Sequence, residues 1–210
     1  MKVLVVAPHP DDEAIGCGGA ICLHVARGDR VTAVFLTSGE LGLKHLPRDE
    51  AWRVRESEAR GAAEVLGLSS LTFLRSPDWT LGDHIGETAE KLQTVLRDEN
   101  PELLYLPHAG DAHPDHQATL PIVRRALRGN SRRLLGYEVW TPLAEYDEVK
   151  DISGAMERKL EAVKLYRSQL GYYQYERAVR GLNEYRGAMA GRCQFAEVFR
   201  LLTDVVEEAR

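Results

Sequence analysis

The N-terminal segment combines a short apolar run with four ionisable side chains. The apolar residues 3–6 lead directly into His9, Asp11, Asp12 and Glu13, so a buried strand delivers one imidazole and three carboxylates to a single turn. Carboxylates that are crowded together repel one another and resist removal from water unless a cation compensates them. We therefore expect a cation where this strand ends.

A second cluster has the same relation to an apolar run. Residues 103–106 are apolar and precede His113, Asp115 and His116. In open parallel sheets, binding sites form outside the carboxyl ends of the strands, near the point where the strand order reverses. Two strand ends that each carry His and Asp therefore predict a divalent metal held between them.

The rest of the chain alternates apolar strands with helices. Expected strands cover residues 2–7, 31–37, 71–75, 103–107 and 134–140, and expected helices cover residues 12–27, 48–66, 84–100, 115–128 and 157–169. Near-continuous apolar strands between helices are typical of a parallel sheet covered on both faces. We predict a single α/β domain over residues 1–210, a Rossmann-like three-layer sandwich with a mostly parallel sheet and an appended C-terminal subregion. The type of element at residues 195–202 is left open.

Glycines within the first expected helix do not indicate dinucleotide binding. The segment Gly16-Cys17-Gly18-Gly19 lacks the order of the G-x-G-x-x-G motif and lies beyond the turn. We interpret it as a site of close helix–sheet packing.

Composition excludes several classes of protein. The net charge is −5 and acidic residues are interspersed among the basic ones, which argues against nucleic acid as a partner. No apolar run approaches the ~20 residues of a membrane span, and no signal-peptide pattern is visible, so we expect a cytoplasmic location. Cys17, Cys22 and Cys193 form no C-x-x-C pair, and we expect free thiols.

The spacing within each cluster suits a metal site. His9 and Asp12 are three residues apart, as are His113 and His116, and such pairs face the same way in the first turn of a helix. Helix capping would explain the Asp residues but not three His residues. We choose His9, Asp12 and His116 as ligands, because a catalytic zinc ion usually has three protein ligands and an open position. Ferrous iron accepts the same set.

Three of the remaining ionisable residues then have catalytic roles, whereas Glu13 is expected to support the site or to cap the helix. Asp11 is placed to act as the general base, and His113 to donate a proton or to stabilise an oxyanion. Asp115 is expected to orient His113 and keep it cationic. Spacing alone does not decide whether Asp11 or Asp12 is the ligand.

The two motifs together, A-P-H-P-D-D-E and H-P-D-H, resemble the LmbE/PIG-L family of zinc-dependent N-acetylglucosaminyl deacetylases. Further segments that resemble the family are Thr37–Glu40, Arg55 with Glu58, Lys159, Ser168–Gln169, Arg186–Gly187 and Phe195–Phe199. The resemblance implies a zinc enzyme, a homo-oligomer, that removes the acetyl group from an N-acetyl sugar conjugate by attack of metal-bound water.

The resemblance also separates the two aspartates. It assigns His9, Asp12 and His116 to the metal and Asp11 to the base, and it implies that Arg55 contacts substrate. Glu40 and His108, at the ends of two strands, are further candidates for substrate binding.

Two rival functions share these residues. One is an amidase that acts on a larger acyl or thiol–sugar conjugate, and the other is a Rossmann-like module that binds a metal without catalysis. The aglycone is left open, because the family acts on thiol-precursor conjugates, phosphatidylinositol glycans, chitooligosaccharides and glycopeptide antibiotics. Also open is whether aromatic residues stack on sugar or serve packing and oligomer contacts, namely Trp79, Tyr172, Tyr173, Tyr175 and Tyr185.

Overall fold

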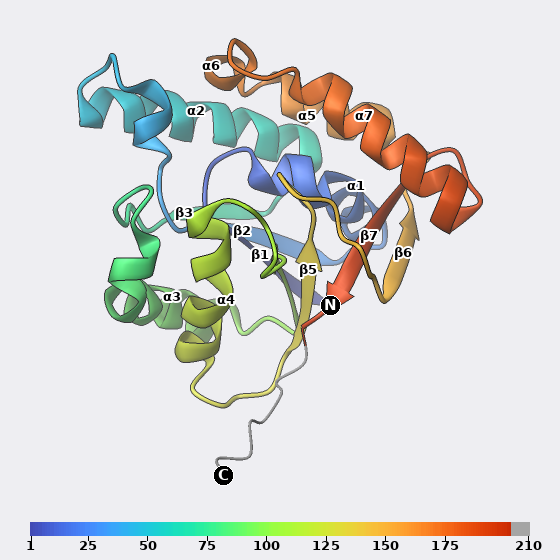
Figure 1. The fold of residues 1–210 in the computed structure, drawn as a ribbon. Helices are drawn as coiled ribbons and strands as arrows, with labels where there is room; N and C mark the ends of the chain where they lie inside the picture. The colour runs from blue at the N-terminus through green and yellow to red at the C-terminus, as the bar shows by residue number, and fades with distance from the viewer. Residues whose placement is uncertain (203–210) are drawn as a thin grey trace.

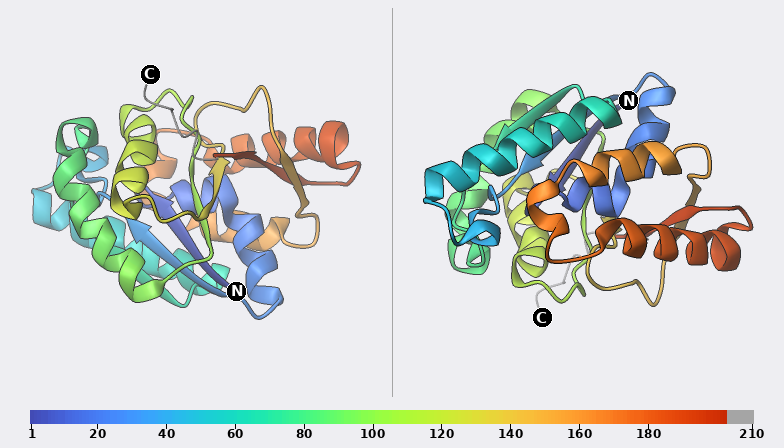
Figure 2. Two further views of the ribbon diagram at one scale, coloured as in Figure 1. Left: turned by 90° about the horizontal axis from the view of Figure 1, so that it is seen from below. Right: turned by 90° about the horizontal axis from the view of Figure 1, so that it is seen from above.

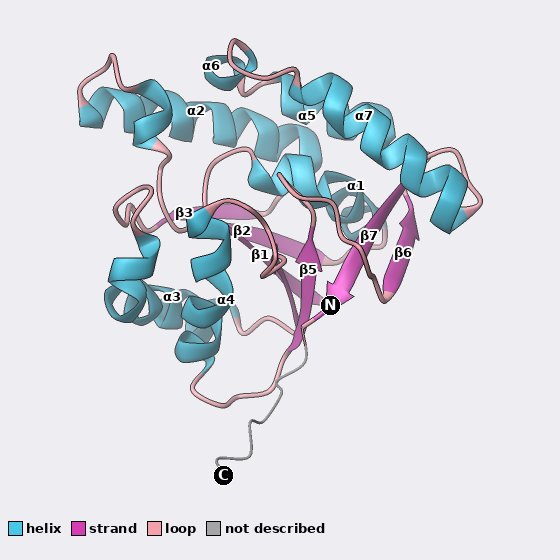
Figure 3. Ribbon diagram, viewed as in Figure 1, coloured by secondary structure: helices cyan, strands magenta, loops and turns pink. Residues whose placement is uncertain are grey.

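The computed structural model describes residues 1–202, which form one seven-stranded sheet with helices on both faces (Figures 1 and 3). The strands are β1 (Lys2–Ala7), β2 (Arg30–Phe35), β3 (Ser70–Phe73), β4 (Leu103–Pro107), β5 (Arg133–Tyr137), β6 (Glu148–Asp151) and β7 (Ala196–Leu201). The helices are α1 (Asp12–Ala26), α2 (Arg48–Leu66), α3 (Ile85–Glu99), α4 (Pro114–Leu127), α5 (Met156–Lys164), α6 (Arg167–Leu170) and α7 (Tyr175–Arg186).

The order of the strands places a switch point at the centre of the sheet. The order is β3-β2-β1-β4-β5-β7-β6, in which β1 to β5 are parallel and β7 runs antiparallel to both β5 and β6. The chain moves outward from β1 to β3 and then returns to the other side of β1 at β4. The strand order thus reverses between β1 and β4. This arrangement confirms the predicted α/β fold with a mostly parallel sheet.

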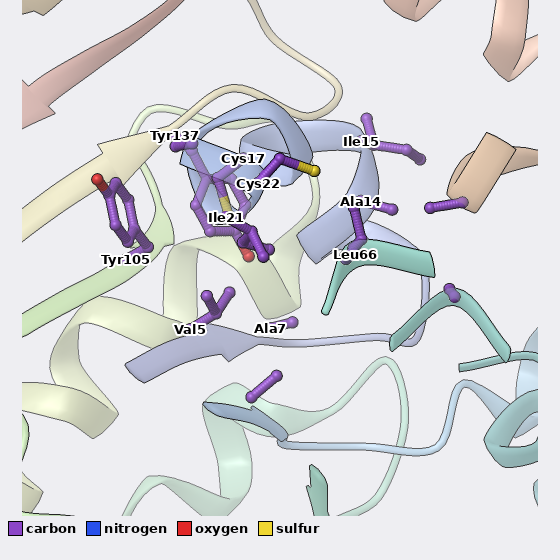
Figure 4. Packing of buried hydrophobic residues seen from close by; sticks show 14 of the residues in the cluster. Val5, Ala7, Ala14, Ile15, Cys17, Ile21, Cys22, Leu66, Tyr105 and Tyr137 are labelled. Atoms are coloured by element: carbon purple, nitrogen blue, oxygen red, sulfur yellow. The ribbon is translucent and has the colours of Figure 1, made fainter. Parts of the chain in front are cut away.

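Alternate residues of β1 enter opposite layers, as the two-residue period of a strand requires. Val3 and Val5 pack with residues of α1, α2 and α5, whereas Leu4 and Val6 pack with residues of α3 and α4. The two views of Figure 2 show these two groups of helices in turn. Figure 4 shows the first layer, where β1 faces side chains of α1 together with Tyr105 and Tyr137. Both faces of β1 are therefore buried.

The glycines of α1 permit a close approach, which confirms the packing interpretation. A Cβ on Gly16 would overlap the Tyr137 ring, and a Cβ on Gly19 would lie 2.6 Å from Ile152. The helix leaves helical geometry at Cys17, where φ is −140°. The Glu197 carboxylate accepts the N–H groups of Gly19 and Ala20, both at 2.8 Å, and so satisfies donors that the break leaves without helical partners.

The C-terminal third differs from the prediction. The helix expected at residues 157–169 is divided, because Tyr166 leaves helical geometry (φ −79°, ψ 53°) and buries its side chain against Glu13. Strand β6 and helix α7 were not predicted. The segment whose type was left open contains strand β7, whose pairing with β5 and β6 depends on residues distant in sequence.

Two expectations from composition can be compared with the structure. All three cysteines are free thiols, with Cys17 and Cys22 buried, as predicted. Among the helices of residues 1–202, none combines the length and the apolar character that a membrane span requires.

Candidate metal and catalytic site

A cavity of about 480 Å³ lies at the carboxyl edge of the sheet. Segments that follow all five parallel strands contribute to its lining: His9, Asp11 and Asp12 after β1, Gly39 and Leu41 after β2, Asp78 and Trp79 after β3, His113 after β4 and Trp140 after β5. The two clusters predicted from sequence thus meet at the switch point, and His116 is buried beside them.

Three of the predicted residues form a nitrogen–oxygen–nitrogen group. Asp12 Oδ2 lies 3.2 Å from His9 Nδ1 and 3.3 Å from His116 Nε2. Neighbouring ligand atoms of a tetrahedral zinc ion are separated by about 3.4 Å, given metal–ligand bonds of about 2.1 Å. Each of these two separations fits a pair of ligands that share one metal ion.

The opposite ring nitrogens of both histidines face carboxylates. His9 Nε2 lies 3.1 Å from both Asp115 Oδ2 and Asp78 Oδ1, and His116 Nδ1 lies 3.0 Å from Asp111 Oδ1. A carboxylate on one nitrogen fixes the proton there and turns the lone pair of the other nitrogen outward, the arrangement usual behind metal-binding histidines. Both lone pairs then point toward Asp12.

One buried ring nitrogen of this group lacks a partner within residues 1–202. Buried His116 Nε2 has no hydrogen-bond partner among the described residues, since its contact with Asp12 lacks hydrogen-bond geometry. Burial by itself would lower the pKa of His116, but Asp12 and Asp111 raise it to about 9. Burial would raise the pKa of Asp12, yet His116 and His9 lower it far below the usual range. The residues present fit a divalent cation, which satisfies the orphaned nitrogen.

Two groupings of the described side chains have ligand atoms that all lie within 4.8 Å of one another, and neither of them contains Asp12. One is His9 with His113 and His116, and another is His9 with Asp78 and Asp115. In the second grouping, however, the carboxylates already accept backbone N–H groups, Asp115 from Trp79 and Leu81 and Asp78 from Leu41. These acids thus position His9. Asp12 Oδ2 likewise accepts the His9 N–H at 2.9 Å, so it is the unpartnered His116 Nε2 beside Asp12 that favours this side for a cation.

Asp11 has an unusual backbone and a perturbed carboxyl group. Its φ is 125°, and its N–H donates to Glu13 Oε2 at 3.1 Å. Its Oδ2 lies 3.3 Å from Nη2 of Arg55, which also donates to the Pro10 carbonyl. Burial raises the pKa of Asp11 to about 6, although the Arg55 charge opposes the shift. A carboxylate with such a pKa beside a metal site suits general-base chemistry.

His113 is the N-cap of helix α4, and its partners differ from those predicted. Its Nδ1 accepts the Asp115 N–H at 3.2 Å, which leaves the ring hydrogen on Nε2. Burial, together with the charges of His9 and His116, lowers the pKa of His113 to about 4. The Asp115 side chain faces His9 rather than this ring, so the expectation that Asp115 keeps His113 cationic does not match the structure. This geometry leaves the Nε2–H of His113 available as a hydrogen-bond donor.

Of the three residues expected to bind substrate, only Arg55 lines the cavity. Glu40 accepts the Trp52 Nε1–H at 3.0 Å and pairs with Arg48 at 3.3 Å. The His108 ring lies between the Thr141 carbonyl, at 2.7 Å, and the Gly110 N–H. The structure thus gives Glu40 and His108 loop-supporting contacts outside this cavity.

Several residues of the site were missed from sequence. Asp78 and Asp111 support the two histidines, and each follows a strand within a few residues, a signal that could have identified them. Trp140 was also missed, and its ring centroid lies 5.6 Å from that of His113. Trp79, which was named above as a candidate for sugar stacking, lies 4.6 Å from the same ring. Nothing in the local sequence marks Trp140 as part of the site.

Comparisons with known proteins give the family and the fold. Residues 4–127 match the PIG-L family, described as GlcNAc-PI de-N-acetylase. The chain is 33% identical to the probable N-acetyl-alpha-D-glucosaminyl L-malate deacetylase 2 of Bacillus cereus, over 80% of this chain and 83% of the relative. It is 31% identical to the diacetylchitobiose deacetylase of Thermococcus kodakarensis, over 97% of this chain and 84% of the relative. The crystal structure of the conserved protein TT1542 from Thermus thermophilus is similar, with a TM-score of 0.84, 33% identity and coverage of 97% and 95% of the two chains.

Proposed function

The chain belongs to the PIG-L family, and on this premise we propose that it is a metal-dependent hydrolase that removes the N-acetyl group from an N-acetylglucosamine-type sugar conjugate. The observation that carries the proposal is the position of Asp12 Oδ2 between His9 Nδ1 and His116 Nε2, with Asp11, which pairs with Arg55, next to it in the chain. The names of the relatives from Bacillus cereus and Thermococcus kodakarensis support the substrate class.

In this proposal His9, Asp12 and His116 hold a zinc ion. Two imidazoles and one carboxylate suit zinc, although ferrous iron accepts the same set. A divalent ion bound there would polarise the acetyl carbonyl and lower the pKa of a water molecule toward neutrality. Asp111 and Asp115 hold the two imidazoles with their lone pairs toward the ion.

The side chains around the ligands then move the protons. Asp11 takes a proton from the attacking water, and Arg55 holds the Asp11 carboxylate in place. His113 donates its Nε2–H to the acetyl oxygen as negative charge develops there. Asp11 returns the proton to the sugar nitrogen as the C–N bond breaks, so one water and one acetamide give acetic acid and a free amine, and a final proton exchange leaves acetate and the ammonium form of the amine.

Release of the amine from N-acetylated sugars tests this function. The protein is loaded with zinc, offered N-acetylglucosamine and its glycosides, and compared with the same preparation after chelation. We expect metal-dependent release of amine and acetate in equal amounts, and almost none from Asp11→Ala with its metal retained. If the protein binds metal but releases no amine from any acetylated sugar, it is a metal-binding module without this activity, and the proposal is overturned.

A further inference from the structure

A second cavity of about 500 Å³ adjoins the candidate active site. It lies between helix α7 and the segment that follows β5. Trp140, Tyr173 and Tyr175 line both cavities, so these three residues form an aromatic wall that the two spaces share. The catalytic groups proposed above do not use this second space.

The lining of the second cavity is mainly apolar. Ile15, Val139, Val179 and Leu182 contribute aliphatic side chains. Four polar side chains also border the cavity, namely Glu138, Gln174, Arg177 and Asn183. Arg177 donates to Gln174, and Asn183 donates to the Ala196 carbonyl. The Glu138 carboxylate already accepts hydrogen bonds from Arg186 and from the Leu143 N–H. A charged ligand group placed here would lose water without gaining a partner from Glu138, whereas an apolar group would be stabilised by burial.

A row of rings connects this cavity to the proposed catalytic histidine. The ring centroids are 5.6 Å apart for His113 and Trp140, and 5.4 Å apart for Trp140 and Tyr173. Tyr173 is in turn 5.4 Å from Tyr175. Trp140 and Tyr173 leave 46% and 51% of their surfaces exposed, so ring faces remain available to a ligand.

We propose that the second cavity binds the aglycone of the substrate and that this aglycone is apolar, an aryl or alkyl group joined to N-acetylglucosamine. The inference rests on the proposed function, because it places the acetamide at His113 and Asp11. A sugar that reaches across Trp140 and Tyr173 then carries its substituent into the second cavity. The aromatic wall is thus a determinant of specificity between substrates that share the acetamide.

Gly181 offers a way to close the second cavity alone. It lies on α7 in the cavity lining, and a Cβ added there would meet no described atom within 4 Å. Gly181→Phe fills the cavity, whereas Gly181→Ala controls for the change in helix propensity. Glu184→Phe places the same ring on an exposed part of α7 outside the cavity lining.

The test compares the methyl and 4-nitrophenyl glycosides of N-acetylglucosamine, in both anomers. We expect the wild type to show a kcat/KM about tenfold higher for one aryl anomer than for its methyl counterpart. Gly181→Phe should remove this preference and leave methyl glycoside turnover unchanged, while both control variants keep the preference. Equal kcat/KM values in the wild type, or an unchanged preference in Gly181→Phe, would overturn the inference.

A binding measurement separates failure of this inference from failure of the proposed function. If no glycoside is deacetylated, the proposed function fails, and equilibrium binding of the 4-nitrophenyl glycoside is then measured by calorimetry. Binding to the wild type that is lost in Gly181→Phe but kept in Gly181→Ala supports an apolar subsite. Absence of binding, or equal binding to all variants, contradicts it.

Discussion

Tyr166 donates its hydroxyl hydrogen bond to Glu13 across 153 residues of sequence. Both side chains are buried, and the second oxygen of Glu13 accepts the Asp11 N–H at 3.1 Å. Asp11 has a φ of 125°, a backbone conformation that L-residues rarely adopt and that surrounding contacts must hold. The pair therefore fixes the position of the proposed general base from a distance, and it explains why the helix expected at residues 157–169 is interrupted at Tyr166.

Removal of this hydroxyl should slow the reaction without removing the metal. Tyr166→Phe keeps the buried ring but removes the hydrogen bond to Glu13 Oε1. Glu13 Oε2 still accepts the Asp11 N–H. We expect kcat to fall about tenfold, with KM and metal content close to wild type, because Asp11 is less well placed. Tyr105→Phe removes a buried hydroxyl that contacts His24 instead, and it should leave kcat unchanged. Equal kcat values for Tyr166→Phe and wild type would contradict a positioning role.

The pH dependence of kcat/KM should follow the ionisation of Asp11. Burial raises the pKa of Asp11 to about 6, and a general base must be unprotonated, so kcat/KM should increase as the pH rises through about 6. The Arg55 charge lowers this pKa, so Arg55→Met should move the rise to higher pH. Arg55→Lys keeps the charge and should leave the midpoint near that of the wild type. If the pH midpoint of kcat/KM is the same in Arg55→Met as in the wild type, Asp11 is not the general base.

Asp111 should tune metal affinity through His116. Its Oδ1 lies 3.0 Å from His116 Nδ1, while its Oδ2 accepts the N–H groups of Trp140 and Thr141. We expect Asp111→Asn to weaken zinc binding by about 10–100-fold, as loss of such supporting carboxylates typically does. Affinity is measured by competition with a chromogenic chelator. Asp29→Asn removes a similar partner from His24, away from the cavity, and should leave the affinity unchanged. Equal zinc affinities in Asp111→Asn and Asp29→Asn would show that Asp111 does not support a metal-binding His116.

The buried pair of Lys159 and Glu197 should matter for stability rather than for chemistry. Lys159 Nζ lies 2.7 Å from Glu197 Oε1, and both side chains are almost fully buried. Lys159→Met leaves the Glu197 charge without its cation, so we expect the free energy of unfolding to fall by about 3–5 kcal/mol in denaturant titrations. Lys91→Met breaks the more exposed pair with Glu87 and should change little. Similar losses in the two variants would contradict the prediction.

Local patterns predicted the elements that position the site, but not the contacts that complete it. The bounds of α2 and β4 agree with those expected, because Pro47, Gly67 and the residues around Pro101 interrupt regular structure strongly. Spacing within one helical turn led to His9 and His116 as proposed ligands, whereas only the resemblance to the family separated Asp12 from Asp11. The contacts of Asp78, Asp111 and Tyr166 depend on loops and helices that meet only in the folded chain. For the same reason the sequence did not indicate that Asp115 faces His9, or that β7 lies between β5 and β6.

The position of the metal is the most direct test of the account. Crystals of the zinc-loaded protein, with anomalous diffraction recorded on both sides of the zinc absorption edge, locate the ion independently of the chain. We predict one strong peak within about 2.1 Å of His9 Nδ1, an Asp12 oxygen and His116 Nε2. A peak between His9, Asp78 and Asp115 instead, or no peak in this cavity, would contradict the assignment on which the proposed chemistry depends.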